Sequence, residues 1–280
     1  MIRIGFIDYR LDEWHANNYP AWIRAAAKDL GIDCALSYAW AEECAPEGLL
    51  STAAWCEKFD CAPCDTLEQV CEKADALIVL APSNPEKHLP YAERVLPFGK
   101  PTYIDKTFTP SCEEARRIFE LGRKYGAPLF STSALRFADE LKDYANVHSA
   151  FVSGSGSSLE EYAIHIIEMI VCLMGEGSRS VCLYGSAEHA LCDIDYGGGR
   201  RAALVYGANM PYQFDVQPSE GSASEFRAVN SAFFPGLIRA ILTFFETKKI
   251  PVPEEQTLEC MKLRDAILKA AMTPGSRVGV

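Results

Sequence analysis

The first half of the chain alternates short apolar segments with amphipathic ones, and this alternation constrains the fold more than any other feature. Five apolar segments are typical of buried strands, at 3–8, 33–38, 76–81, 101–104 and 127–131. Between them apolar residues recur at helical spacing, as in 19–30, and Ser111 with Glu114 fits a capping box ahead of another helix. Such strand–helix repeats predict a doubly wound parallel sheet.

The second half follows a different order. A strand is expected at 148–153, and a glycine- and serine-rich turn at 154–158 precedes a long apolar helix at 159–174. Further strand candidates lie at 180–184, 189–196, 201–206 and 212–217, and closing helices at 233–247 and 254–272. We therefore predict two domains. Residues 1–134 carry the parallel sheet, and residues 135–280 form an α+β domain with a mostly antiparallel sheet covered by helices on one face.

Charge and hydropathy narrow the range of partners. The 27 basic and 38 acidic residues give a net charge of −11, which repels nucleic-acid phosphates. Apolar stretches such as 76–82 are far too short to span a bilayer, and the N-terminus resembles a buried strand, not a signal peptide. We expect a cytoplasmic protein that binds a small-molecule substrate, without nucleic acid or membrane partners.

The chain has 11 cysteines. Cys56, Cys61 and Cys64 have a C-x4-C-x2-C spacing that resembles one iron–sulfur pattern, but Cys71, the nearby candidate for a fourth ligand, falls in a helical pattern. Without a secretion signal, reduced thiols are the simpler interpretation. We predict no metal site.

An acid–base pair, Asp105-Lys106, follows the strand at 101–104. A charged pair at the carboxyl end of a buried strand is costly unless it faces a cleft, and ligands of open α/β sheets bind at that end. A lysine there can position or protonate a substrate.

Three polar residues interrupt the apolar helix at 159–174. Glu161, His165 and Glu168 share one face, and a carboxylate one turn from a histidine suits general acid–base work. The alternatives are that Glu161 only caps the helix and that His165 is a satisfied core residue.

Two other residues are expected near the carboxyl edge of the parallel sheet. His88 should open the helix after strand 76–81, and Arg136 lies just past strand 127–131. The simpler interpretations are a surface residue at a helix start and a salt bridge at a hinge.

A series of short motifs resembles one family when taken in order. They are Ala81-Pro82 after a strand, His88 eleven residues before Gly99, Asp105-Lys106-Thr107, Leu135-Arg136-Phe137, Glu161-x3-His165, the stretch 251–259 and Gly275-Ser-Arg-Val278. Their order and spacing resemble the Gfo/Idh/MocA family of two-domain NAD(P)-dependent oxidoreductases, whose N-terminal domain is Rossmann-like.

This resemblance implies an enzyme that transfers a hydride between NAD or NADP and a sugar, cyclitol or related hydroxy compound. Lys106 would bind and polarise the substrate oxygen, His165 would accept or donate the proton, and Glu161 would orient His165. The cofactor-binding positions it implies are Gly5, Asp8, Tyr9, Arg10, Ala81, Pro82, Asn84, His88, Asp105 and Arg136.

The chain departs from the family at the phosphate-binding loop. The glycines of G-x-G-x-x-G after Gly5 are missing, and Asp8, Asp12 and Glu13 add negative charge with only Arg10 to compensate. His15 matches a histidine that the family often has shortly after this loop. The alternative is a degenerate member that has lost the dinucleotide and acts as a ligand-binding or regulatory protein or a non-redox enzyme.

Two points concern specificity and assembly. The second strand ends at 37–40 with no acid at its tip to hold a ribose diol, and Glu42 and Glu43 lie further on, so NAD and NADP remain alternatives. A sheet with helices on one face leaves the other to be covered, so we expect a homo-oligomer through the C-terminal sheet.

Overall fold

The computed structural model describes residues 1–280 and divides into two compact units. The first comprises Met1–Thr132 with Leu237–Pro253, and the second comprises Ser133–Gly236 with Glu254–Val280. Residues 237–253, which we expected in the second domain, therefore belong to the first. The reason is packing: the ring of Phe244 lies 5.2 Å from that of Phe130, edge to face.

The first unit is built on a sheet of six parallel strands, as the alternating pattern predicts. The strand order is β3-β2-β1-β4-β5-β6. Strands β2 and β3 are added on one side of β1, and strands β4 to β6 on the other, so the order switches between β1 and β4. Ligands of such sheets bind beyond the strand carboxyl ends at this switch point. The strands are β1 (Ile2–Asp8), β2 (Cys34–Ala41), β3 (Ala62–Pro63), β4 (Ala76–Val79), β5 (Thr102–Ile104) and β6 (Leu129–Phe130).

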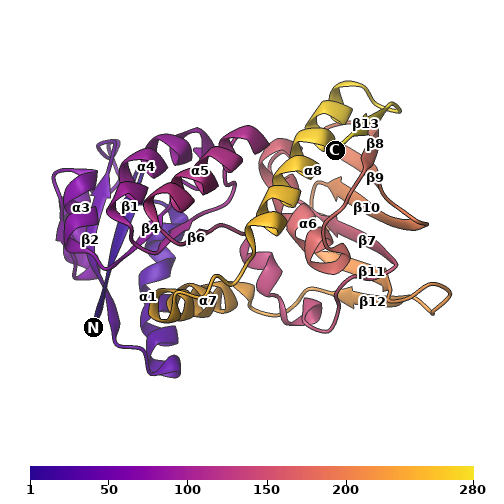
Figure 1. The fold of residues 1–280 in the computed structure, drawn as a ribbon. Coiled ribbons are helices and arrows are strands. Elements are labelled where there is room, and N and C mark those ends of the chain that lie inside the picture. Colours follow the sequence, from indigo (N-terminus) through magenta and orange to yellow (C-terminus); the bar gives the residue numbers. More distant parts are fainter. The chain divides into compact units, whose positions relative to one another are not determined.

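Helices cover both faces of this sheet (Figure 1). In the first unit α1 and α7 lie on one face, while α3, α4 and α5 lie on the other. The α-helices are α1 (Trp14–Leu30), α2 (Thr52–Phe59), α3 (Leu67–Lys73), α4 (His88–Val95), α5 (Cys112–Tyr125) and α7 (Phe233–Thr247). Short 3-10 turns are η1 (Pro85–Lys87) and η2 (Leu96–Phe98), with η3 (Ala134–Phe137) and η4 (Asp139–Leu141) in the second unit.

The second unit contains a seven-stranded sheet in the order β12-β11-β7-β10-β9-β8-β13. Its neighbours are antiparallel except β7 and β10, which are parallel. The mostly antiparallel sheet is therefore confirmed. The strands are β7 (Ser149–Gly154), β8 (Ser180–Gly185), β9 (His189–Gly197), β10 (Arg200–Gly207), β11 (Gln213–Gln217), β12 (Glu225–Ala228) and β13 (Arg277–Gly279).

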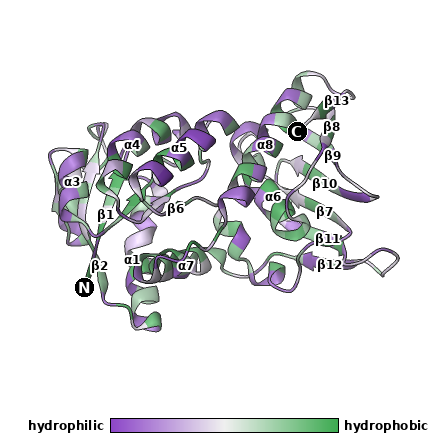
Figure 2. Ribbon diagram, viewed as in Figure 1, coloured by the Kyte–Doolittle hydropathy of each residue, from purple (hydrophilic) through white to green (hydrophobic).

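Two helices, α6 (Leu159–Met174) and α8 (Glu254–Met272), cover one face of this sheet. Figure 2 shows α6 as predominantly hydrophobic, and its side chains at Ile166, Ile167 and Ile170 are fully buried. The sequence pattern predicts the bounds of α6 and its burial because an apolar helix must be enclosed. None of the helices combines the length and apolar content that crossing a membrane requires.

Candidate functional site

At the carboxyl edge of the first unit's sheet, Asp8 joins two strand ends. Its Oδ1 accepts hydrogen bonds from the Ala81 amide (2.9 Å), just after β4, and from the Tyr9 amide (2.6 Å). Ala81 has φ of +57°, a left-handed conformation that costs a non-glycine residue energy. The Asp8 carboxyl group therefore helps to hold the backbone on both sides of the switch point.

Asp8 is also electrostatically unusual. It is 1% exposed, and its Oδ2 has no hydrogen-bond partner. Burial raises the pKa of Asp8 well above its ordinary range, and the negative charge of Glu13 raises it further. The raised pKa means that burial favours the protonated, uncharged form of this carboxyl group.

The loop after β1 ends at Glu13, which caps α1 with its own side chain. The carboxylate accepts hydrogen bonds from the backbone N–H groups of His15 (2.8 Å) and Ala16, and lies 3.2 Å from Nδ1 of His15. In dinucleotide-binding folds this helix terminus receives the pyrophosphate. Here a side chain of the protein satisfies those amides.

Other contacts fix the loop itself. Asp12 accepts hydrogen bonds from the Leu50 amide (2.8 Å) and from Nδ2 of Asn17 (2.8 Å), and Leu11 is 2% exposed. The segment after β1, where a phosphate-binding motif would carry its glycines, is here a packed, hydrogen-bonded turn.

Gly5, expected at the cofactor, lies inside β1. A Cβ there would come within 2.4 Å of Val70 Cγ1, so the glycine is required by the packing of α3 on the sheet. This is a structural reason for Gly5 that needs no phosphate.

Lys106 lies one residue beyond Asp105 at the end of β5 and is half-buried. Its Nζ donates a hydrogen bond to the carbonyl oxygen of Pro82 at 3.1 Å, and no carboxylate lies within 4 Å of it. A half-buried ammonium without an acidic partner is costly to keep, so this group is a good candidate for binding a substrate oxygen.

Asp105 and His88 form buried contacts at the carboxyl edge of the first unit's sheet. Asp105 Oδ1 accepts a hydrogen bond from the Tyr103 hydroxyl at 2.7 Å, and its Oδ2 lies 3.8 Å from Nε2 of His15. His88 is completely buried, with Nδ1 2.8 Å from the Phe108 carbonyl oxygen and Nε2 against that of Leu80. Burial lowers the pKa of His88. His88 is therefore not a surface residue, and its ring connects two loops.

The end of β2 differs from the prediction that no acidic residue lies at the tip of this strand. The strand continues to Ala41, so Glu42 directly follows it. Its carboxylate contacts Lys87 Nζ (2.8 Å) and the Tyr91 hydroxyl (2.5 Å), and the Lys87 contact lowers the pKa of Glu42. An acid is thus present where Rossmann folds hold the ribose diol.

Three other residues expected at the cofactor lie in the loops that follow β1 and β4. They are Tyr9, Arg10 and Asn84. The guanidinium of Arg10 is 5.2 Å from the ring centroid of Tyr9, and Nζ of Lys87 is 5.1 Å from the same centroid. Asn84 donates a hydrogen bond to Glu86 at 3.0 Å, just after Pro82. These positions stay predictions for cofactor binding.

In the second unit, His165 is paired with a residue that sequence reasoning missed. Nδ1 of His165 lies 2.7 Å from Oγ of Ser133, and the Ser133 amide donates to Glu168 Oε1 at 3.2 Å. The polar run at 131–133 after the last strand was the available signal. Ser133 is fully buried and can hold the half-buried imidazole in one orientation.

Glu168 and Arg136 support this arrangement from inside the unit. Arg136 Nε lies 2.7 Å from Glu168 Oε2, and its NH1 donates to Gln256 at 2.6 Å. Arg136, expected at the cofactor, thus forms a buried ion pair within the second unit. The polar stripe on α6 carries a connected network from Arg136 to His165.

Glu161 lies in the first turn of α6. Its backbone N–H donates a hydrogen bond to Ser158 Oγ at 3.2 Å, and its carboxylate accepts one from Ser157 Oγ at 3.1 Å. The Ser158 half of the predicted capping box is therefore observed. Its role in orienting His165 stays a prediction.

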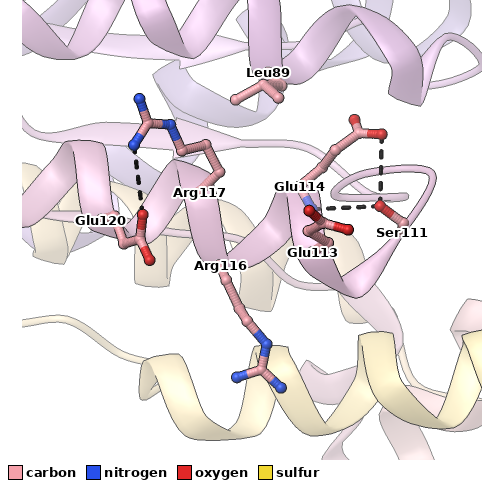
Figure 3. Close-up of a pocket in the computed structure, with 7 residues that line it drawn as sticks. All are labelled: Leu89, Ser111, Glu113, Glu114, Arg116, Arg117 and Glu120. Carbon is pink, nitrogen blue, oxygen red and sulfur yellow. Dashed lines mark hydrogen bonds and ion pairs between the residues drawn. The ribbon is translucent and has the colours of Figure 1, made fainter.

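A separate surface hollow of about 530 Å³ lies along α5 in the first unit (Figure 3). Arg117 and Glu120 pair across 3.5 Å there, and Ser111 Oγ caps the amide of Glu114 at 3.3 Å. Its other lining residues are Leu89, Glu113 and Arg116. The hollow was not expected from the sequence, and its charged side chains are typical of a solvated helix surface.

The cysteines do not form a cluster site. All are free thiols, and no group of three or more His, Cys, Asp or Glu side chains is arranged to hold a metal ion. Cys56 and Cys64 are buried. The iron–sulfur alternative has no support in the structure.

Comparison with known proteins gives one curated relative and many similar folds. No protein-family model matches the chain. The uncharacterized oxidoreductase YhhX of Escherichia coli K12 is 23% identical over 194 residues, covering 67% of this chain and 52% of the relative. The chain thus spans about half the length of the curated relative that it matches.

Two solved structures illustrate the similarity in fold. The UDP-N-acetylglucosamine 3-dehydrogenase GnnA from Acidithiobacillus ferrooxidans aligns over 98% of both chains at 12% identity, with a TM-score of 0.78. GenD2 from gentamicin A biosynthesis, in complex with NAD, aligns over 100% of this chain and 97% of its own at 13% identity, with a TM-score of 0.79. The structure therefore confirms the resemblance: this chain has the fold of the Gfo/Idh/MocA-type dehydrogenases.

Proposed function

We propose that the protein is an oxidoreductase that transfers a hydride between a nicotinamide cofactor and the hydroxyl-bearing carbon of a sugar, cyclitol or related compound. The fold supports this proposal, as does the NAD in the GenD2 complex. The observation that carries it is the half-buried ammonium of Lys106, which has a neutral carbonyl and no carboxylate as partner.

Lys106 has the chemistry to recognise a substrate oxygen. An ammonium donates up to three hydrogen bonds, and here one goes to the Pro82 carbonyl oxygen. A substrate hydroxyl or carbonyl oxygen would take another. The positive charge would stabilise the oxygen as its proton is lost, which lowers the barrier to oxidation.

His165 is the group that would exchange the substrate proton. Its ring is fixed at Nδ1 by Ser133, whose hydroxyl can either donate or accept as the ring changes protonation state. Glu161, one turn away on α6, would favour the protonated imidazole. Lys106, His165 and Glu161 are thus the proposed catalytic residues.

The residues at the sheet edge fit part of a dinucleotide. Glu42 lies where an acid binds a ribose diol and disfavours a 2′-phosphate, so we expect NAD rather than NADP. The start of α1 does not fit a pyrophosphate as it stands, because the Glu13 carboxylate occupies its amides. The nicotinamide would supply the hydride chemistry when bound.

Fluorescence titration of the protein with NADH and NADPH tests this proposal. We expect saturable binding of NADH, and weaker binding of NADPH. Absence of binding of either at millimolar concentration would contradict the proposal and favour the alternative of a ligand-binding protein.

A further inference from the structure

The start of α1 is an anion-binding cradle that the protein fills itself. Two backbone N–H groups, of His15 and Ala16, and Nδ1 of His15 all meet the Glu13 carboxylate. These donors, at the positive end of a helix dipole, are the kind that bind phosphate oxygens. A carboxylate and a phosphate oxygen cannot both occupy them.

We propose that Glu13 is an internal competitor for the pyrophosphate of the dinucleotide, so its side chain must leave the start of α1 before the cofactor binds in full. This inference rests on the proposed oxidoreductase function. It assigns Glu13 the role of setting cofactor affinity.

The surrounding contacts make the Glu13 side chain the group that can move. Asp8 is tied to the Tyr9 and Ala81 amides, and Asp12 to Leu50 and Asn17, so the loop backbone is held at both ends. The Glu13 side chain, by contrast, is 21% exposed, so it can rotate into solvent while the loop stays in place.

Charge adds to the competition. A pyrophosphate that entered beside the Glu13 carboxylate would meet electrostatic repulsion that weakens its binding. Removal of Glu13 would therefore free the amides and also relieve this repulsion.

The test is a calorimetric titration of NADH into the wild type and the Glu13→Ser variant. Serine keeps a good N-cap for α1 but is too short to fill the cradle as a carboxylate does. We expect NADH to bind about tenfold more tightly to Glu13→Ser, a change that the strength of charge contacts at helix ends allows. Thermal melting of both proteins verifies that they are folded.

Glu93→Ser is the matched control. It removes one exposed acidic charge on α4, away from the start of α1 and from the residues proposed to bind the cofactor, and we expect wild-type affinity. Equal NADH affinity of wild type and Glu13→Ser would overturn the inference and leave the oxidoreductase proposal intact. No binding to any of the three proteins would contradict both. An equal gain in Glu93→Ser would overturn the inference by assigning the effect to net charge.

Discussion

At the scale of single residues, three acids define the edge of the first unit's sheet. Asp8 braces two loops, Glu13 caps α1, and Glu42 follows β2. Their identities are visible in the sequence, and the negative charge of Asp8 and Glu13 at the two ends of the loop between β1 and α1 is the reason to expect weak phosphate binding there. Their partners could not be predicted, because each lies far along the chain or depends on how the loop folds.

The buried Asp8 makes stability depend on pH. Its folded-state pKa is raised, whereas an aspartate in the unfolded chain has a pKa of about 3.9. The folded protein therefore holds this proton more tightly, and Asp8 costs stability as the pH rises above about 4. We expect the stability of the wild type relative to Asp8→Asn to fall as the pH rises from about 4 to neutral pH.

Urea denaturation of both proteins across this pH range measures the change. The substitution can also change the free energy of unfolding by a constant amount through packing. The prediction concerns only how the difference between the two proteins changes with pH. The exposed Asp143→Asn serves as control and should show no such slope. A difference between wild type and Asp8→Asn that is the same at both ends of the range would contradict this account of Asp8.

At the scale of elements, the sequence predicted much of what forms. The bounds of α6 agree because its apolar pattern and the Ser158 cap are local signals. The end of β2 was missed, because hydrogen bonding to a neighbouring strand extended it to Ala41. The assignment of 237–253 was missed because it depends on the contact between Phe244 and Phe130, which are distant in sequence.

The packing of α3 on β1 predicts a cost for enlarging Gly5. A methyl group there would meet Val70 Cγ1 at 2.4 Å, so Gly5→Ala should destabilise the protein by about 1–3 kcal/mol. Gly279→Ala is the matched control because its Cβ would meet nothing within 4 Å. The urea concentration at the midpoint of unfolding measures the stability of each variant. An unchanged midpoint for Gly5→Ala would show that α3 can shift freely.

The Ser133–His165 pair connects a loop to α6 and predicts a change in pH dependence. Without the hydroxyl, the ring loses the partner that fixes Nδ1. We expect Ser133→Ala to shift the pH profile of kcat/KM and lower its maximum about tenfold, in keeping with a lost positioning contact. Loss of activity with an unchanged profile would instead indicate a merely structural role, and Ser133→Thr should restore the wild-type profile.

At the scale of the whole molecule, we propose that the second unit's sheet mediates self-association. Its helix-free face carries exposed Phe151, Tyr184, Leu191 and Phe226, which are 42–55% exposed. Apolar side chains gathered on one face favour burial against a second copy. Light scattering should give a mass of at least twice the 30.9 kDa of one chain, lowered by Phe151→Asp.

The matched control for assembly is Ile250→Asp, which changes an exposed apolar residue assigned to the first unit. It should leave the mass unchanged. A wild-type mass equal to one chain would contradict self-association without bearing on the chemistry.

Lys106 is the residue on which the proposed hydride transfer depends most directly. The direct measurement is the rate of NADH formation from NAD with a panel of sugars and cyclitols, comparing the wild type with Lys106→Gln. Lys124→Gln, an exposed lysine on α5, is the control. We expect turnover by the wild type and the control, with Lys106→Gln reduced at least about a hundredfold, as for other groups that stabilise a developing charge. Equal turnover by the wild type and Lys106→Gln would contradict the account.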